Sequence, residues 1–174
     1  MKKIFKYIFA GMAAMSVVAC SEDALETSPS SSVSGNELLG TATNALVSLN
    51  GVYRAMYTAG VSNSSNTHQC FGITAYNLVA DVMGEDCIMN GQGSGWFWYD
   101  CVYNVKSRYT STGWRSYDMW NGYYTWISNV NYILAEEETM SGSETEKNYV
   151  LGQAYAVRAY RYSKLAQKFS RTYK

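Results

Sequence analysis

Residues 114–169 read WRSYDMWNGYYTWISNVNYILAEEETMSGSETEKNYVLGQAYAVRAYRYSKLAQKF, and their spacing decides the fold class. Large apolar side chains recur at steps of three and four residues from 114 to 134, which predicts a helix. Ser141-Gly142-Ser143 is a turn, and the acids just after Ser143 are typical of a helix N-terminus. A further helix should run from there to about Phe169. The stretch therefore predicts a helical hairpin.

Two more helices are predicted earlier in the chain. After Gly35-Asn36-Glu37, apolar residues recur at helical steps as far as Met56, which predicts a helix of roughly 24 residues that ends before Gly60. Beyond a loop rich in Ser and Asn, a second helix is predicted from Cys70 to Met83, with Gly84 as its stop.

The segment between the two predicted helix pairs has no regular spacing. Three glycines lead into Trp96-Phe97-Trp98-Tyr99, and the next regular pattern begins only near Trp114. A long irregular loop inside a compact domain is usually functional.

These elements predict an all-α fold built from two helical hairpins with a long irregular aromatic loop between them. A hairpin alone leaves an apolar face uncovered, so the pairs should stack like tetratricopeptide repeats. An irregular four-helix bundle is the alternative.

The first 34 residues carry the features of an exported lipoprotein. Lys2, Lys3 and Lys6 precede an apolar run over 7–19 that is too short to span a bilayer, which predicts a signal peptide over residues 1–19. The following Cys20 stands where a bacterial lipobox has its acylated cysteine, so a lipid anchor is expected there. Ser21-Glu22-Asp23 resembles the acidic tag of surface-exposed lipoproteins, and residues 20–34 should form a flexible tether.

Composition narrows the classes of function. Sixteen tyrosines and five tryptophans stand against a single proline and a single histidine, and such aromatic richness suits wet, flat binding surfaces. Removing the three signal-peptide lysines from 14 basic against 14 acidic residues leaves a net charge of −3, which disfavours nucleic acid. Cys70, Cys87 and Cys101 allow one disulfide and a free thiol, or none.

The helix-pair residues also resemble a known family. The match runs through both halves of the second pair and through Leu49-Asn50-Gly51-Val52-Tyr53 in the first helix, and it resembles the SusD/RagB family of outer-membrane nutrient-binding lipoproteins. In the second pair it is carried by Trp120-x3-Tyr124-x2-Ile127-x3-Asn131-x2-Leu134 and by Leu151-Gly152-Gln153-Ala154-x3-Arg158-Ala159-Tyr160-x-Tyr162-x2-Leu165.

The resemblance implies a cell-surface lipoprotein of the outer membrane that binds oligosaccharides or peptides and hands them to a SusC-like, TonB-dependent transporter. Gln153 departs from the glutamate usual in that family. Because family members are longer, residues 35–174 are expected to be the N-terminal part of a SusD-like α-helical domain. The competing hypothesis is a structural or adaptor lipoprotein that binds only a protein partner through its helical pairs.

The aromatic loop supplies the candidate ligand site. Trp96, Trp98 and Tyr99 could stack on sugar rings, with Asn104 hydrogen-bonding hydroxyl groups, as could Asp100 or Arg108. Alternation along the loop would send half of the rings inward. No catalytic residue, metal site or cofactor is predicted, since the only histidine, His68, lies in a polar loop and no nucleophile or phosphate motif occurs.

Two polar residues are predicted to have structural roles. Arg158 falls in an apolar stripe of the last helix, so we expect it to be buried and paired with Asp81 or Asp86. A calcium site on those acids, or their simple exposure, are the alternatives. Asn131, among apolar residues of the preceding helix, should be a buried amide that bonds a neighbouring element.

Overall fold

The computed structural model describes residues 35–59, 66–84, 86–102 and 109–170, and within these ranges it contains helices and turns but no strand. The predicted all-α class is confirmed. None of the helices in these ranges has both the length and the apolar character needed to cross a membrane. The signal peptide, Cys20 and the tether, as well as Asn104 and Arg108, lie outside the described residues.

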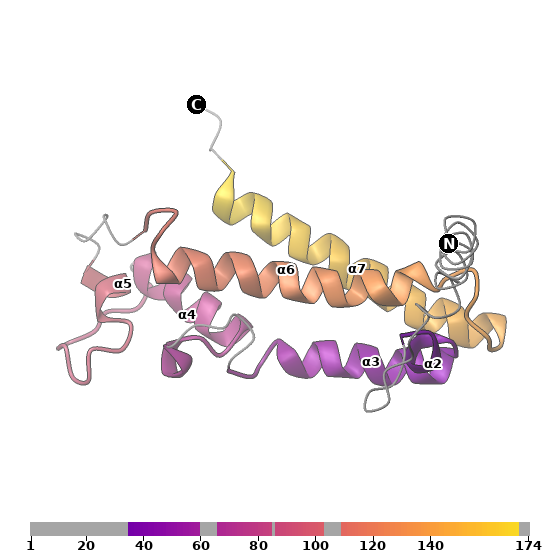
Figure 1. Cartoon of the computed structure of the whole chain (residues 1–174). Coiled ribbons are helices and arrows are strands. Elements are labelled where there is room, and N and C mark those ends of the chain that lie inside the picture. Colours follow the sequence, from indigo (N-terminus) through magenta and orange to yellow (C-terminus); the bar gives the residue numbers. More distant parts are fainter. Residues whose placement is uncertain (1–34, 60–65, 85, 103–108, 171–174) are drawn as a thin grey trace, which may run out of the picture. The chain divides into compact units, whose positions relative to one another are not determined.

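The predicted second hairpin is confirmed as the longest structural unit. Helix α6 (Trp114–Ala135) and helix α7 (Glu144–Phe169) pack along their length as antiparallel neighbours (Figure 1). Ser143 begins α7 with a capping box, because its side chain accepts from the Glu146 N–H while the Glu146 carboxylate accepts from the Ser143 N–H. The Ser143 hydroxyl and the Ser143 N–H both donate to the Glu146 carboxylate, and these two hydrogen bonds lower its pKa.

The first predicted helix is divided into two. Helix α2 (Gly35–Leu39) ends before Gly40, and helix α3 (Ala42–Ala55) begins after Thr41, whose side chain caps it by accepting from the Asn44 N–H. Extended backbone at Thr41 forms a bridge with Ser141 in the α6–α7 turn. The Ala42 N–H donates to the Ser141 carbonyl at 2.8 Å, and the Ser141 N–H donates to the Gly40 carbonyl at 2.9 Å. This pairing across the chain breaks the helical pattern.

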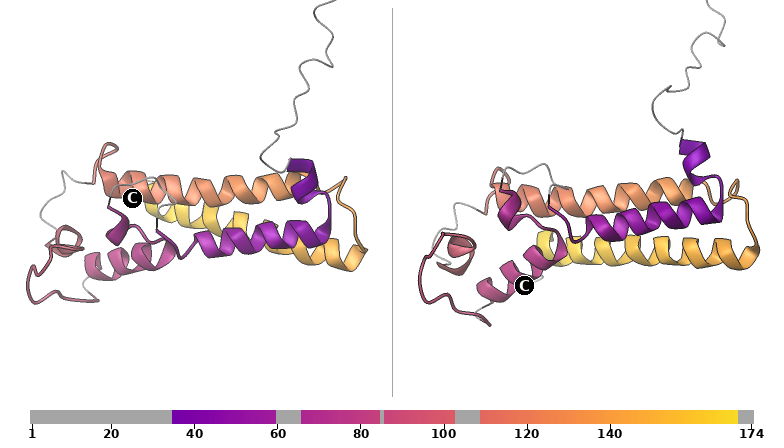
Figure 2. Two further views of the ribbon diagram at one scale, coloured as in Figure 1. Left: turned by 60° about the horizontal axis from the view of Figure 1, so that its bottom comes forward. Right: turned by 90° about the horizontal axis from the view of Figure 1, so that it is seen from below.

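The first predicted pair does not form a hairpin. After the short 3-10 helix η2 (Thr67–Gln69), helix α4 (Ile73–Met83) begins against the end of α3, where the Ile73 N–H donates to the Met56 carbonyl. Helix α4 then continues the course of α3 along α6 instead of folding back on it (Figure 2). Expected stacking of two tetratricopeptide-like pairs is thus replaced by two helices laid end to end against one hairpin.

The junction between α3 and α4 depends on Gly72. This residue has a φ of 74°, in the left-handed region, and a Cβ there would lie 2.0 Å from the Met56 carbonyl oxygen. Only glycine fits both constraints. The chain can therefore turn into α4 directly at the end of α3.

Aromatic side chains build the centre of the core. Tyr76 of α4 contacts Tyr123 and Trp126 of α6, with ring centroids 5.4 and 5.9 Å apart. The Tyr76 hydroxyl donates to the Asp118 carbonyl at 2.9 Å, and it can approach because Gly122 has no side chain: a Cβ there would lie 2.3 Å from that hydroxyl. Burial raises the pKa of the Tyr76 phenol far above its ordinary value. The core thus uses rings in place of aliphatic residues, and the hydroxyl of Tyr76 is hydrogen-bonded, whereas the indole Nε1 of Trp126 has no partner among the described residues.

We expect Gly72→Ala to lower the free energy of unfolding by about 3 kcal/mol or more, because it combines a left-handed φ with a clash against backbone. The matched control is Gly51→Ala inside α3, where a Cβ meets nothing within 4 Å. That change should raise stability by about 0.5 to 1 kcal/mol through helix propensity. Urea denaturation of both variants measures the difference, and equal stabilities would contradict the role of Gly72.

Candidate functional site

The aromatic segment of residues 86–102 is organised around one unusual backbone conformation. Phe97 is the one described non-glycine residue with positive φ, at 58°. Its N–H donates to the Gln69 side-chain carbonyl at 2.8 Å, and its own carbonyl accepts from the N–H groups of Asp100 and Cys101. The short helix α5 (Trp98–Val102) therefore begins directly after it. Such a conformation costs on the order of 1 to 3 kcal/mol, so the surrounding contacts must hold it in place.

A buried ion pair joins this segment to α6. Arg115 and Asp100 are 3% and 4% exposed, and the Arg115 Nη2 lies 2.9 Å from the Asp100 Oδ2. The Arg115 Nε donates to the Asp100 Oδ1 at 3.3 Å, so the contact is bidentate. The Tyr109 hydroxyl donates to the same Oδ1 at 2.6 Å. Nearly all of the acceptor capacity of this carboxylate is used within the protein.

The same arginine also ties η2 to the site. Its Nη1 donates to the Gln69 main-chain carbonyl at 2.7 Å. The guanidinium lies over the Trp114 ring, 4.2 Å from its centroid, and 5.1 Å from the centroid of Phe97. Arg115 thus connects three segments that are far apart in sequence, and its charge is neutralised where it sits.

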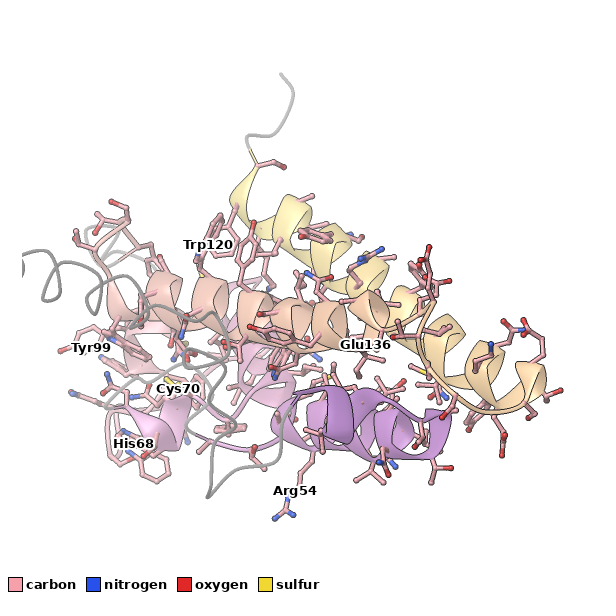
Figure 3. All side chains as sticks on the ribbon, turned by 45° about the vertical axis from the view of Figure 1, so that its right-hand side comes forward. Arg54, His68, Cys70, Tyr99, Trp120 and Glu136 are labelled. Carbon is pink, nitrogen blue, oxygen red and sulfur yellow. The ribbon has the colours of Figure 1, made fainter. Side chains whose placement is uncertain are left out.

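Two rings of the segment are open to solvent. Trp96 is 50% exposed and Tyr99 is 41% exposed, whereas Phe97 between them is buried in the core. The His68 ring lies against Trp96, with centroids 4.8 Å apart and planes tilted by 32°. Figure 3 shows His68 and Tyr99 at the same end of the helices, far from Glu136 at the end of α6.

A small hollow lies beside these rings. It has a volume of about 140 Å³ and is bounded by residues of η2, the aromatic segment and the start of α6: Asn66, Gln69, Gly95, Tyr99, Asp100, Tyr109, Trp114 and Arg115. Its charged members are the neutralised pair of Arg115 and Asp100. The rim is therefore aromatic and polar without a net charge.

The predicted ligand residues differ in how far they are exposed to solvent. Trp96 and Tyr99 offer exposed faces, and Trp98 in α5 is only half-buried. Asp100 was expected to be available for sugar hydroxyl groups, but it is buried and bonded to Arg115 and Tyr109. Strict alternation of rings is not observed, because the chain becomes helical after Phe97.

The predicted structural role of Arg158 is wrong. This residue is not buried, and its Nη1 donates to the Asn131 side chain at 3.2 Å while its guanidinium lies over the Tyr155 ring. Asn131 bonds a neighbouring helix as expected, but it is exposed. Asp81 and Asp86 are exposed at the end of α4, and no ion pair joins them to Arg158 in the described part of the chain.

The buried cation of α7 is Arg161, one turn beyond Arg158. It is 7% exposed, its Nη2 approaches the Met56 sulfur at 3.2 Å, and its Nε has no hydrogen-bond partner among the described residues. The rings of Trp126 and Tyr160 lie 5.4 and 4.9 Å from its guanidinium carbon. Burial lowers the pKa of the Arg161 guanidinium.

Sequence periodicity places both buried arginines on apolar stripes, but along α7 it does not separate Arg161 from Arg158. Arg115 lies on the α6 stripe that continues through Met119 and Tyr123, and Arg161 lies on the α7 stripe between Val157 and Leu165. Extending the α6 stripe back by one turn would have placed the Arg115 guanidinium inside.

The thiols and potential metal ligands offer no further site. Cys70 is buried, Cys87 is exposed and Cys101 is half-buried. In the ranges that the structure describes, no three side chains of His, Cys, Asp or Glu are grouped so that they could hold a metal ion.

These features define an all-α protein that presents aromatic ring faces on a segment held by a buried ion pair. Residues 89–174, which include α5 and the α6–α7 hairpin, match the family model of SusD-like proteins, described as starch-binding and associating with the outer membrane. This match supports membership of the SusD-like family, as the helix-pair residues indicated. The comparisons with curated proteins and with solved structures gave no match.

We expect Arg115→Met to lower the free energy of unfolding by about 3 to 5 kcal/mol, because it leaves the buried Asp100 carboxylate without its cation. Thermal or urea unfolding measures the loss. The double variant Arg115→Met with Asp100→Leu should recover much of it, since both charges are then absent.

The matched control is Arg161→Met, because no carboxylate pairs with this buried arginine in the part of the chain that the structure describes. It loses only contacts to rings and to a thioether, so its cost should stay below about 1 kcal/mol. Equal losses for the two single variants would refute the importance of the ion pair.

Proposed function

We propose that the protein is a cell-surface lipoprotein that binds oligosaccharides on the exposed faces of Trp96 and Tyr99 and delivers them to a TonB-dependent transporter of the outer membrane. The observation that carries this proposal is the exposure of these two rings on an otherwise ordered segment. The family description, starch-binding and associating with the outer membrane, supports the same ligand class and location.

The geometry suits a sugar for a physical reason. A pyranose ring presents apolar C–H groups on its faces, and these stack on the faces of indole and phenol rings. His68 lies against Trp96, and Phe97 anchors the same short stretch in the core. Because the rings are held before the ligand arrives, less conformational entropy is lost on binding.

Charge at the rim favours a neutral ligand. Arg115 and Asp100 neutralise each other, and Asn66 and Gln69 add uncharged polar groups beside the hollow. A neutral oligosaccharide needs ring faces and uncharged hydrogen-bonding groups, whereas an acidic or basic peptide needs an opposite charge. We therefore favour an oligosaccharide over a peptide, with Trp98 as a flanking ring and Asn104 as a further contact.

The lipid anchor and the membrane location form a separate part of the proposal. The predicted signal peptide covers residues 1–19, directly before Cys20, and the tether of residues 20–34 would give the helical part reach above the membrane. Three acyl chains on Cys20 would bury far more methylene groups than the single chain that gives only marginal binding. The proposed role is binding, without catalysis.

A second candidate function is that of an adaptor that binds only a protein partner. The exposed aromatic residues of α6, which are Tyr117, Trp120 and Tyr124, favour it because they share one face of the helix. Figure 3 shows Trp120 on the side of α6 that faces α7. The two functions use different rings, so substitutions separate them.

We expect Trp96→Ala or Tyr99→Ala to weaken oligosaccharide binding by about 1 kcal/mol or more, which is roughly a fivefold increase in Kd. Isothermal titration with starch-derived oligosaccharides measures the change. Trp120→Ala serves as the control, since it removes an equally exposed ring outside the site. If Trp120→Ala alone weakens binding, or if both site variants bind as the parent does, the glycan site is not on the aromatic segment.

We expect Cys20→Ala to abolish membrane attachment of the exported protein, because the acylated residue is the proposed anchor. Fractionation of cells that express the variant, with detection of the protein in membrane and soluble fractions, measures this. Ser21→Ala, which leaves the cysteine in place, is the control. A variant that still sediments with membranes would disprove anchoring through Cys20.

A further inference from the structure

A second hollow, which shares Arg115 and Tyr109 with the first, lies between three helices. It has a volume of about 360 Å³ and is walled by α4, α6 and the end of α7. Its apolar wall consists of Val79, Ala80 and Met83 from α4, Met119 from α6 and Phe169 from α7. This volume falls in the range of sites for small ligands, which are mostly apolar with a few polar groups.

One net charge faces this apolar wall. Lys168 lines the hollow, and in the described part of the chain no acid forms an ion pair with it. The other cation of the lining, Arg115, is already neutralised by Asp100. Ser116 and Tyr109 complete the lining, and the Tyr109 hydroxyl is already bonded to Asp100. The lining of the hollow is thus mostly apolar and carries a single unneutralised positive charge, that of Lys168.

The surroundings of Lys168 make an anion favourable there. Lys168 is exposed, but partial desolvation by neighbouring groups, and then the charge of Lys164 one turn earlier, disfavour the ammonium and lower the pKa of Lys168. A bound anion offsets both effects, because it supplies the opposite charge at short range. Lys164 itself lies over the Tyr160 ring and donates to Gln167, and it is not part of the lining.

We propose that this hollow binds a small amphiphilic carboxylate, with its apolar body against Val79, Met83 and Met119 and its carboxylate at Lys168. The volume suits a ligand of about ten to fifteen non-hydrogen atoms. This site is separate from the aromatic segment and takes a charged ligand, whereas the proposed oligosaccharide is neutral.

The test uses 4-phenylbutyrate as the probe and 4-phenylbutanamide as its neutral counterpart, titrated calorimetrically into the purified full chain. Lys168→Met should weaken binding of the acid at least tenfold and leave the amide unaffected, since the variant keeps the apolar stem and removes the charge. Lys164→Met is the matched control, and it should change affinity for the acid by less than twofold.

Ala80→Trp tests the location independently. Ala80 is exposed and lines the hollow, so an indole there fills it without disturbing the core, and both probes should lose binding. Far-UV circular dichroism checks that each variant is folded. The proposal is overturned if the acid does not bind the parent, if Lys164→Met weakens it as much as Lys168→Met, or if Ala80→Trp leaves binding intact.

Discussion

The bidentate contact between Arg115 and Asp100 is the interaction on which one end of the molecule depends. Phe97 is the one residue of the 86–102 range that belongs to the buried core, so this range has little apolar surface of its own to bury. Its order therefore depends on polar contacts that converge on one guanidinium. Because these contacts are buried, their electrostatic energy is large, and so is the desolvation that they must offset.

A second constraint follows from the many tyrosines and tryptophans. When their rings fill the core, their hydroxyl and N–H groups are buried too and need hydrogen-bond partners. Tyr76 solves this with a hydrogen bond to a main-chain carbonyl of α6, and the missing side chain of Gly122 gives it room. Tyr53 donates to Gln153 between α3 and α7 at 3.1 Å. At position 153 the amide thus accepts a hydrogen bond where the resembling family usually has a carboxylate. The tyrosines that pack between helices therefore also supply hydrogen bonds between those helices.

Local patterns predicted the elements better than their arrangement. The spacing in α6 and α7 and the cap at Ser143 are local, and the structure agrees with them closely. The break at Thr41 was missed because it depends on Ser141, a hundred residues away in sequence. The expected first hairpin failed for a similar reason, since the turn at Gly72 is fitted to the backbone of Met56.

The same limit applies to the candidate sites. Arg158 and Arg161 each lie at helical spacing from buried neighbours, so periodicity along α7 did not distinguish them. They differ in what they meet on α6, because Arg161 lies over the Trp126 ring whereas Arg158 donates to the Asn131 side chain. Which rings are exposed depends on the positive φ of Phe97. No sequence motif predicts a positive φ at this non-glycine residue. The cluster of glycines and aromatic residues predicted Trp96, Trp98 and Tyr99 together as ligand residues, and it did not show that Trp96 and Tyr99 are the exposed ones while Trp98 is half-buried.

The bridge between Thr41 and Ser141 has a mechanical consequence. A pull on the chain ahead of residue 35 travels along the backbone through α2 and meets this bridge before it reaches α3. The two main-chain hydrogen bonds at Ser141 then carry the load together with the α6–α7 turn, so the tension passes into the longest helices. Under such a pull the bridge between Thr41 and Ser141 is therefore loaded before α3, and its two main-chain hydrogen bonds can re-form once the pull ends.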